Sequence, residues 1–111
     1  NLWQTARFFY SHGDRETNPY PDRLLKVTVS TRRAAREEIS EFLFNATGQL
    51  IFYFGLDEMG ENRLYFANGK LIRWQKGEKI SDANSRQAQE IARDVLSRKE
   101  KLARIFRSSL E

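Results

Sequence analysis

Residue types suited to acid–base or metal chemistry are few in this sequence and do not cluster. His12 is the only histidine, and it lies beside Gly13 and Asp14 in a stretch typical of a loop. A lone histidine cannot build a histidine-rich metal site, and a Ser–His catalytic pair would have to use it. The acidic connection 57–62 lacks the ligand spacing and the closing glutamate of an EF-hand loop. We therefore expect no catalytic residue and no metal site.

Other reactive motifs are also missing. The chain has no cysteine, which excludes disulfides, thiolate zinc sites and cysteine nucleophiles but leaves the cellular compartment open. Its six glycines form no phosphate-binding loop. An enzyme would need a pocket that brings His12 next to Asp57, Glu58 or Glu61. The sequence therefore favours a non-enzymatic domain without a cofactor.

Positive charge is concentrated near the C-terminus. Segment 84–109 holds seven basic and three acidic residues, which account for the whole net charge of +4. Nucleic-acid binding is the alternative function, because phosphate contacts require a basic row on one helix face. That row would consist of Arg86, Arg93, Arg104 and Arg107. Two pairs with the spacing of ordinary helix-surface ion pairs, Asp94–Arg98 and Glu100–Arg104, favour a solvated face instead.

Length and composition predict one domain. The 111 residues fit a single core, with a strand-rich part over residues 1–80 and a C-terminal helix over about 82–109. Residues 2–10 are β-prone, and residues 23–31 alternate as a half-buried strand does. No apolar run approaches the ~20 residues of a membrane-spanning helix. Because the chain begins at Asn1, we expect a processed or excised piece, and any targeting signal or lipid anchor would lie outside it.

Two hairpins are the clearest structural prediction. The first spans residues 38–56 around the loop 45–48, where Gly48 can take the positive φ of a bulged turn. The second spans residues 62–76 around Asn68-Gly69, the pair that a type I′ turn favours.

The hairpins also repeat each other. Leu50–Tyr53 aligns with Leu71–Trp74, and Leu24–Val27 is interpreted as part of a third, degraded copy. We predict an α+β fold in which an antiparallel β-hairpin meander of four to six strands has a long C-terminal helix packed on one face.

The predicted helix is amphipathic. Its candidate N-caps are Ser81, Asp82 and Asn84. Lys99 falls inside the apolar stripe, so either its stem snorkels to solvent or the helix leaves the sheet there. A helix of ~39 Å would extend past strands of ~27 Å, which would free Leu102 and Phe106 to contact another protomer.

If Phe44 pairs with Leu50 and Phe66 pairs with Leu71 across the hairpins, strand alternation places the hairpin side chains on two faces. The face predicted to lie under the helix holds Phe42, Phe44, Leu50, Phe52, Phe54, Leu64, Phe66 and Leu71. The second face holds Glu41, Leu43, Ile51, Tyr53, Arg63, Tyr65, Ile72 and Trp74. One helix cannot cover both faces, so the second is partly exposed, or is covered by the N-terminal segment, a second copy, or a ligand or partner. The candidate interaction residues are Tyr53, Tyr65, Ile72 and Trp74.

The stretches Phe44–Ile51 and Tyr65–Ile72 resemble the hairpin repeats of MORN-variant, antitoxin-type bacterial proteins, although the second glycine pair of true MORN repeats is missing. The whole layout also resembles small secreted or lipoprotein-like bacterial domains. The resemblance implies a periplasmic, extracellular or envelope location, with a cytoplasmic one left open, and an interaction role. We therefore expect a non-enzymatic binding or accessory domain of the bacterial envelope that uses the aromatic sheet face or the distal helix for a protein partner or a homodimer.

Overall fold

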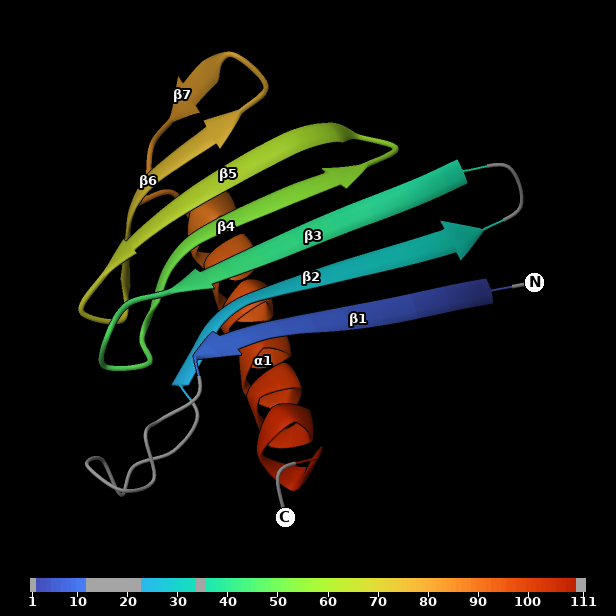
Figure 1. Cartoon of the computed structure of the whole chain (residues 1–111). Coiled ribbons are helices and arrows are strands. Elements are labelled where there is room, and N and C mark those ends of the chain that lie inside the picture. The colour runs from blue at the N-terminus through green and yellow to red at the C-terminus, as the bar shows by residue number, and fades with distance from the viewer. Residues whose placement is uncertain (1, 12–22, 34–35, 110–111) are drawn as a thin grey trace.

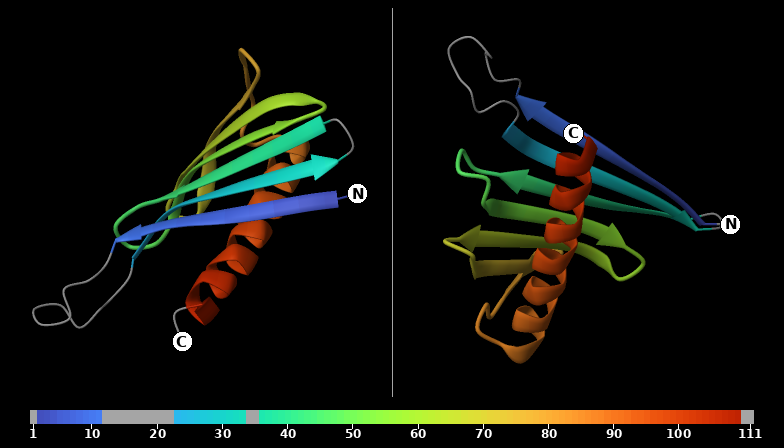
Figure 2. Two further views of the ribbon diagram at one scale, coloured as in Figure 1. Left: turned by 45° about the vertical axis from the view of Figure 1, so that its right-hand side comes forward. Right: turned by 90° about the horizontal axis from the view of Figure 1, so that it is seen from below.

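The computed structural model describes residues 2–11, 23–33 and 36–109, which form one antiparallel sheet and one helix. The strands are β1 (Leu2–Ser11), β2 (Arg23–Arg33), β3 (Arg36–Phe44), β4 (Leu50–Asp57), β5 (Gly60–Ala67), β6 (Lys70–Lys76) and β7 (Lys79–Ser81), and the helix is α1 (Arg86–Ser109). The strands pair in chain order from β1 to β7. Figures 1 and 2 show α1 crossing one face of this sheet. The α+β meander with a C-terminal helix is confirmed, and β7 is an additional strand too short for alternation to reveal.

The turns have the predicted chemistry. Asn68 and Gly69 have φ values of 51° and 79°, as a two-residue type I′ turn requires. In the longer loop between β3 and β4, Gly48 has a φ of 83°. The side chain of Asn45 accepts hydrogen bonds from the backbone N–H groups of Thr47 (3.0 Å) and Gln49 (2.9 Å), which holds that loop closed.

The β1–β2, β3–β4 and β5–β6 hairpins each have a β-bulge on the returning strand. In the β3–β4 hairpin Phe44 pairs with Leu50 but Leu43 pairs with Phe52, so Ile51 is an extra residue. Ile72 in β6 and Leu25 in β2 are the extra residues of the other two hairpins. All three stand second in their aligned segments, so the bulge falls at the same position in each.

The bulge reverses the predicted face of the residues that follow it. Phe42 pairs with Tyr53 and not with Phe52. Tyr53 is 6% exposed and Trp74 is 4% exposed, and both belong to the core under α1. Phe52 and Phe54 lie on the opposite face and are only half-buried. The predicted exposure of Tyr53 and Trp74 is therefore wrong, as is the predicted place of Phe52 and Phe54 under the helix.

The core joins bulky sheet residues to small helix residues. The helix contributes Ala88, Ala92 and Val95, and their short side chains let α1 approach the sheet closely. The sheet contributes Val27, Val29, Phe42, Phe44, Leu50, Tyr53, Leu64, Phe66 and Trp74. This division of sizes lets α1 bury the part of the sheet face that lies directly beneath it.

The helix begins later than predicted. The Ser85 hydroxyl accepts a hydrogen bond from the backbone N–H of Ala88 at 3.1 Å, so Ser85 is the N-cap. Asp82 instead accepts a hydrogen bond from the backbone N–H of Asn84 at 2.9 Å, within the turn that precedes the helix. Asp82 therefore shapes the approach to α1, Ser81 is the last residue of β7, and Ser85 takes the role that was predicted for Ser81, Asp82 or Asn84.

Replacing a leucine on either side of the sheet tests this assignment of faces. Leu64→Ala empties a fully buried site under α1, so we expect a loss of about 2–5 kcal/mol of unfolding free energy. Leu43→Ala removes the same atoms from the half-buried opposite face and should cost about 1 kcal/mol. Urea denaturation measures both. Equal losses would contradict the assignment.

Candidate functional site: an uncovered aromatic sheet face

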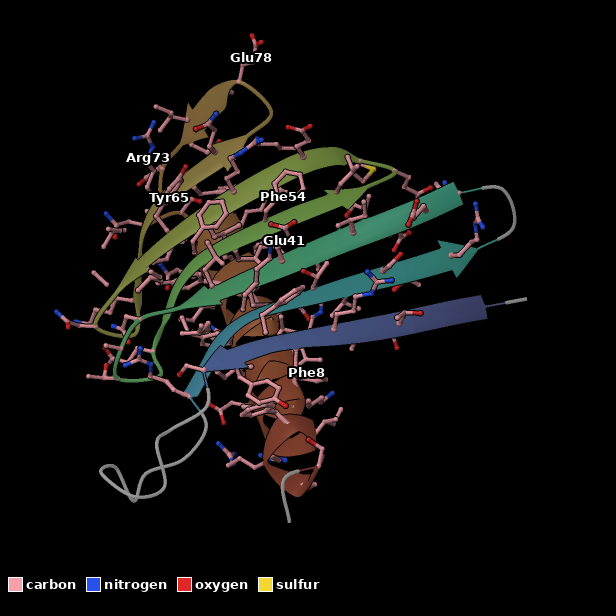
Figure 3. The ribbon with its side chains drawn as sticks, in the orientation of Figure 1. Phe8, Glu41, Phe54, Tyr65, Arg73 and Glu78 are labelled. Atoms are coloured by element: carbon pink, nitrogen blue, oxygen red, sulfur yellow. The ribbon has the colours of Figure 1, made fainter. Side chains whose placement is uncertain are left out.

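The sheet face opposite α1 is covered by none of the described elements. The first strand, β1, continues the sheet beside β2, so the prediction that this strand folds over the second face is wrong. The loop between β1 and β2 lies outside the described residues. In Figure 3 the labelled Glu41, Phe54 and Tyr65 lie on the side of the sheet away from α1.

We call the centre of this surface the outer face. It consists of Ile39, Glu41, Leu43, Phe52, Phe54, Leu56, Arg63, Tyr65 and Arg73, which lie opposite one another across β3, β4, β5 and β6. Apart from the exposed Arg73, these side chains are half-buried by their neighbours in the sheet. A hydrophobic surface with charged members therefore remains open to solvent.

Aromatic and arginine side chains pack against each other on the outer face. The Phe52 and Tyr65 rings lie 5.1 Å apart between centroids, at an interplanar angle of 58°. The guanidinium of Arg63 lies 4.9 Å from the centroid of the Phe54 ring, and that of Arg73 lies 5.6 Å from the Tyr65 ring. These cation–π contacts hold the arginines along the surface. Arg63 also forms an ion pair with Glu61 at 2.9 Å.

This arrangement has the residue types of a protein-binding surface. Aromatic and arginine side chains are the types enriched at protein interfaces, since they offer large contact area with a polar edge. The described residues contain no group of three or more histidine, cysteine, aspartate or glutamate side chains that could hold a metal ion.

The predicted interaction residues fall into two groups. Tyr65 lies on the outer face, and the bulge residue Ile72 is 60% exposed at the neighbouring strand. Tyr53 and Trp74 lie in the core. Sequence reasoning missed Phe52 and Phe54, although Gly48 had pointed to a bulged turn, and a bulge is the feature that moves both residues outward.

The distal helix is less available than predicted. Phe106 is 5% exposed, with ring centroids 5.8 Å from Phe8 and 5.2 Å from Tyr10 on β1. Leu102 is half-buried against the core. Of the two alternatives, the helix that stays on the sheet with a snorkelling Lys99 is the one observed: Phe106 meets β1 and Leu102 packs on the core, so neither candidate interaction residue is free at the surface. Ile105, at 56% exposed, remains open to solvent.

The predicted basic row is exposed, but the predicted ion pairs around it differ. Arg86 pairs with Glu90 at 3.4 Å, and Arg93, Arg104 and Arg107 are exposed. Neither Asp94–Arg98 nor Glu100–Arg104 is an ion pair between described residues.

The ion-pair partner of Glu100 is Lys99, and not Arg104 as the sequence had predicted. The Lys99 ammonium donates a hydrogen bond to Glu100 at 2.6 Å, and this bond, with the lysine charge, lowers the pKa of the Glu100 carboxyl. The Lys99 side chain is otherwise largely buried, as expected for a snorkelling lysine.

The acidic connection between β4 and β5 is held by contacts within the protein. Asp57 accepts a hydrogen bond from the backbone N–H of Met59 at 2.8 Å, which closes the turn. Glu58 forms an ion pair with Arg36 at 2.6 Å. His12, which an enzymatic site would have needed, lies outside the described residues.

A polar cluster lies on the other side of the sheet, beneath α1. The two terminal nitrogens of Arg98 donate hydrogen bonds to Tyr53 Oη at 3.0 Å and to Ser40 Oγ at 2.9 Å. Those hydroxyls lie 3.2 Å from each other. The hydroxyl of Tyr53 also passes over Gly55, where a Cβ atom would come within 2.5 Å of it. The absence of a side chain at Gly55 is therefore what lets the tyrosine reach Arg98.

Comparison with known protein families, curated proteins and solved structures finds no match. Among the described residues, no helix combines the length and the apolar character needed to cross a membrane.

Gly55→Ala tests the contact between Gly55 and Tyr53. The new methyl group would push the buried tyrosine away from Ser40 and Arg98, so we expect a loss of about 1–3 kcal/mol of unfolding free energy. The same change in a Tyr53→Leu background should cost much less, because the ring is then absent. Thermal denaturation of the four proteins gives the coupling, and additive losses would show that the contact is unimportant.

Proposed function

We propose that this chain is a non-enzymatic binding domain of the bacterial envelope and that its outer face binds a protein partner. The proposal rests chiefly on the packed aromatic and arginine side chains on a sheet face that no described element covers. Contiguous exposed apolar surface of this kind marks interaction sites.

The chemistry of the outer face supports a protein ligand. The rings of Phe52, Phe54 and Tyr65 are already held by their neighbours, so binding would cost little side-chain entropy. Both signs of charge, from Glu41, Arg63 and Arg73, surround these rings and would set the orientation of a partner. A nucleic acid would instead require a surface of one sign.

The envelope location rests on the resemblance of the two hairpins to repeats of MORN-variant bacterial proteins and of the layout to secreted domains. Nucleic-acid binding through the basic row of α1 is the alternative. That row is exposed, but Glu90 already neutralises Arg86. Binding by the row would fall steeply with salt, whereas binding by the outer face would depend on salt weakly.

Site-specific photo-cross-linking in cells tests the outer face directly. A cross-linking amino acid at position 65 should give a discrete protein adduct, whereas the same amino acid at position 105 on α1 should give none. Arg73→Glu reverses an exposed charge of the outer face and should reduce the adduct at position 65 at least tenfold.

The mass of the adduct identifies the partner class. An adduct of twice the chain mass means a second copy, and any other protein mass means a different partner, and either would support the proposal. An adduct only at position 105 would move the site to the helix. The proposal fails if position 65 gives no adduct, or one that Arg73→Glu leaves unchanged.

A further inference from the structure

A polar groove runs along one side of α1. Figures 1 and 2 show that β1, β2 and β3 extend beyond the helix on this side. Two adjoining cavities of about 430 and 440 Å³ form the groove, and they share Tyr53, Asp57, Asp94 and Arg98 as lining residues. Each volume lies in the range of ~300–1,000 Å³ that is typical of small-ligand sites.

Arg98 is fixed at the point where the two cavities meet. Its guanidinium lies 5.6 Å from the ring centroid of Phe42 and 5.7 Å from that of Tyr53, and it also holds the hydroxyls of Tyr53 and Ser40. A guanidinium has five N–H donors. Only two are used by the described residues, and none of their carboxylates forms an ion pair with it. A rigid arginine therefore keeps donors for an acceptor that the described part of the chain does not supply.

Carboxylates that face the same groove also keep free capacity. Asp94 and Glu38 have no hydrogen-bond or ionic partner among the described residues, and Asp57 uses one oxygen for the Met59 backbone. The larger cavity thus combines one arginine with three carboxylates. An inorganic anion would be repelled by this excess of negative charge, and a simple cation would leave the donors of Arg98 unused.

We propose that the groove binds a small zwitterion, either a free α-amino acid or a short peptide. The ligand's carboxylate accepts hydrogen bonds from Arg98, whose planar guanidinium matches a carboxylate in geometry. Its ammonium group lies toward Asp57 and Asp94. A ligand of this kind satisfies both sets of unused groups at once.

The groove and the outer face open on opposite sides of the sheet, and Leu56 is the one described residue that lines both. Tyr53 and Ser40 project from the face of the sheet under α1, whereas Phe54 and Tyr65 project from the opposite one. A ligand in the groove would leave the outer face open, so one proposal can fail while the other holds.

Titration of the ¹⁵N-labelled protein with four probes, followed by NMR, tests the groove. The probes are dialanine, free L-alanine, N-acetyl-dialanine without the ammonium group, and dialanine amide without the carboxylate. Dialanine or L-alanine should give saturable shifts in residues along the groove, and the stronger of the two identifies the peptide or the free amino acid as the ligand. Each blocked peptide should bind at least tenfold more weakly than the stronger zwitterion.

Two variants and two control variants test whether Arg98 and Asp94 bind the ligand. Arg98→Lys and Asp94→Asn should each weaken the binding of the stronger zwitterion at least tenfold. Because Asp94 is exposed, the Asp94→Asn variant should retain its fold. As controls outside the groove, Arg93→Lys again replaces an arginine by a lysine and Glu78→Gln again replaces a carboxylate by an amide. Both should leave binding unchanged. Absence of saturable shifts at 20 mM, equal affinity for blocked and free peptides, or binding unaffected by Asp94→Asn would show that Arg98 is only a structural clamp and overturn the proposal.

Discussion

One extra residue on the returning strand of the β1–β2, β3–β4 and β5–β6 hairpins controls which side chains reach the helix. Ile51, Ile72 and Leu25 each occupy a bulge, and the strand beyond each bulge presents the opposite set of side chains from simple alternation. Because Tyr53 and Trp74 then point inward, the hydroxyl of Tyr53 can meet Arg98, and the indole N–H of Trp74 can donate to Asn62 at 3.0 Å. Because Phe52 and Phe54 point outward, the opposite face carries packed aromatic rings. Both surfaces proposed for binding depend on these bulges, and above all on the one at Ile51.

The helix gives the two faces different chemistry. It covers the inner face only along its own width, and there the sheet is aromatic and aliphatic while the helix is small and apolar. Beyond that width, the same face carries Ser40, Glu38 and Thr31, which would be costly to bury without partners and which line the groove instead. The outer face has no helix and is held together by side-chain pairs across the strands. A wide sheet with a single helix therefore produces one polar groove and one open aromatic face.

Local predictions are confirmed where the residues of one short segment are enough to determine its structure. Asn68-Gly69 adopts the turn expected of it because its two positive φ values are a property of those residues alone. The alternation of residues 23–31 gave a strand, and the apolar stripe after residue 85 gave a helix. The N-cap was placed too early because Ser81, Asp82, Asn84 and Ser85 are all chemically suitable, and residue type alone does not distinguish Ser85, the residue that caps α1, from the others. The predicted Asp94–Arg98 ion pair does not form, because Arg98 instead donates to the hydroxyls of Tyr53 and Ser40 on strands distant in sequence.

By itself, the sequence determined the two hairpin turns, the alternating strand over residues 23–31 and the C-terminal helix. These follow from composition and from spacing within a few residues. Tertiary structure alone decided the faces, because a bulge is a property of two paired strands and shifts every side chain beyond it. It also decided that Phe106 packs on Phe8 of β1, and that Arg98 stands between two cavities among residues from β1, β2, β3 and β4. Contacts between residues so far apart in the chain depend on the register of the whole sheet, which no local pattern encodes.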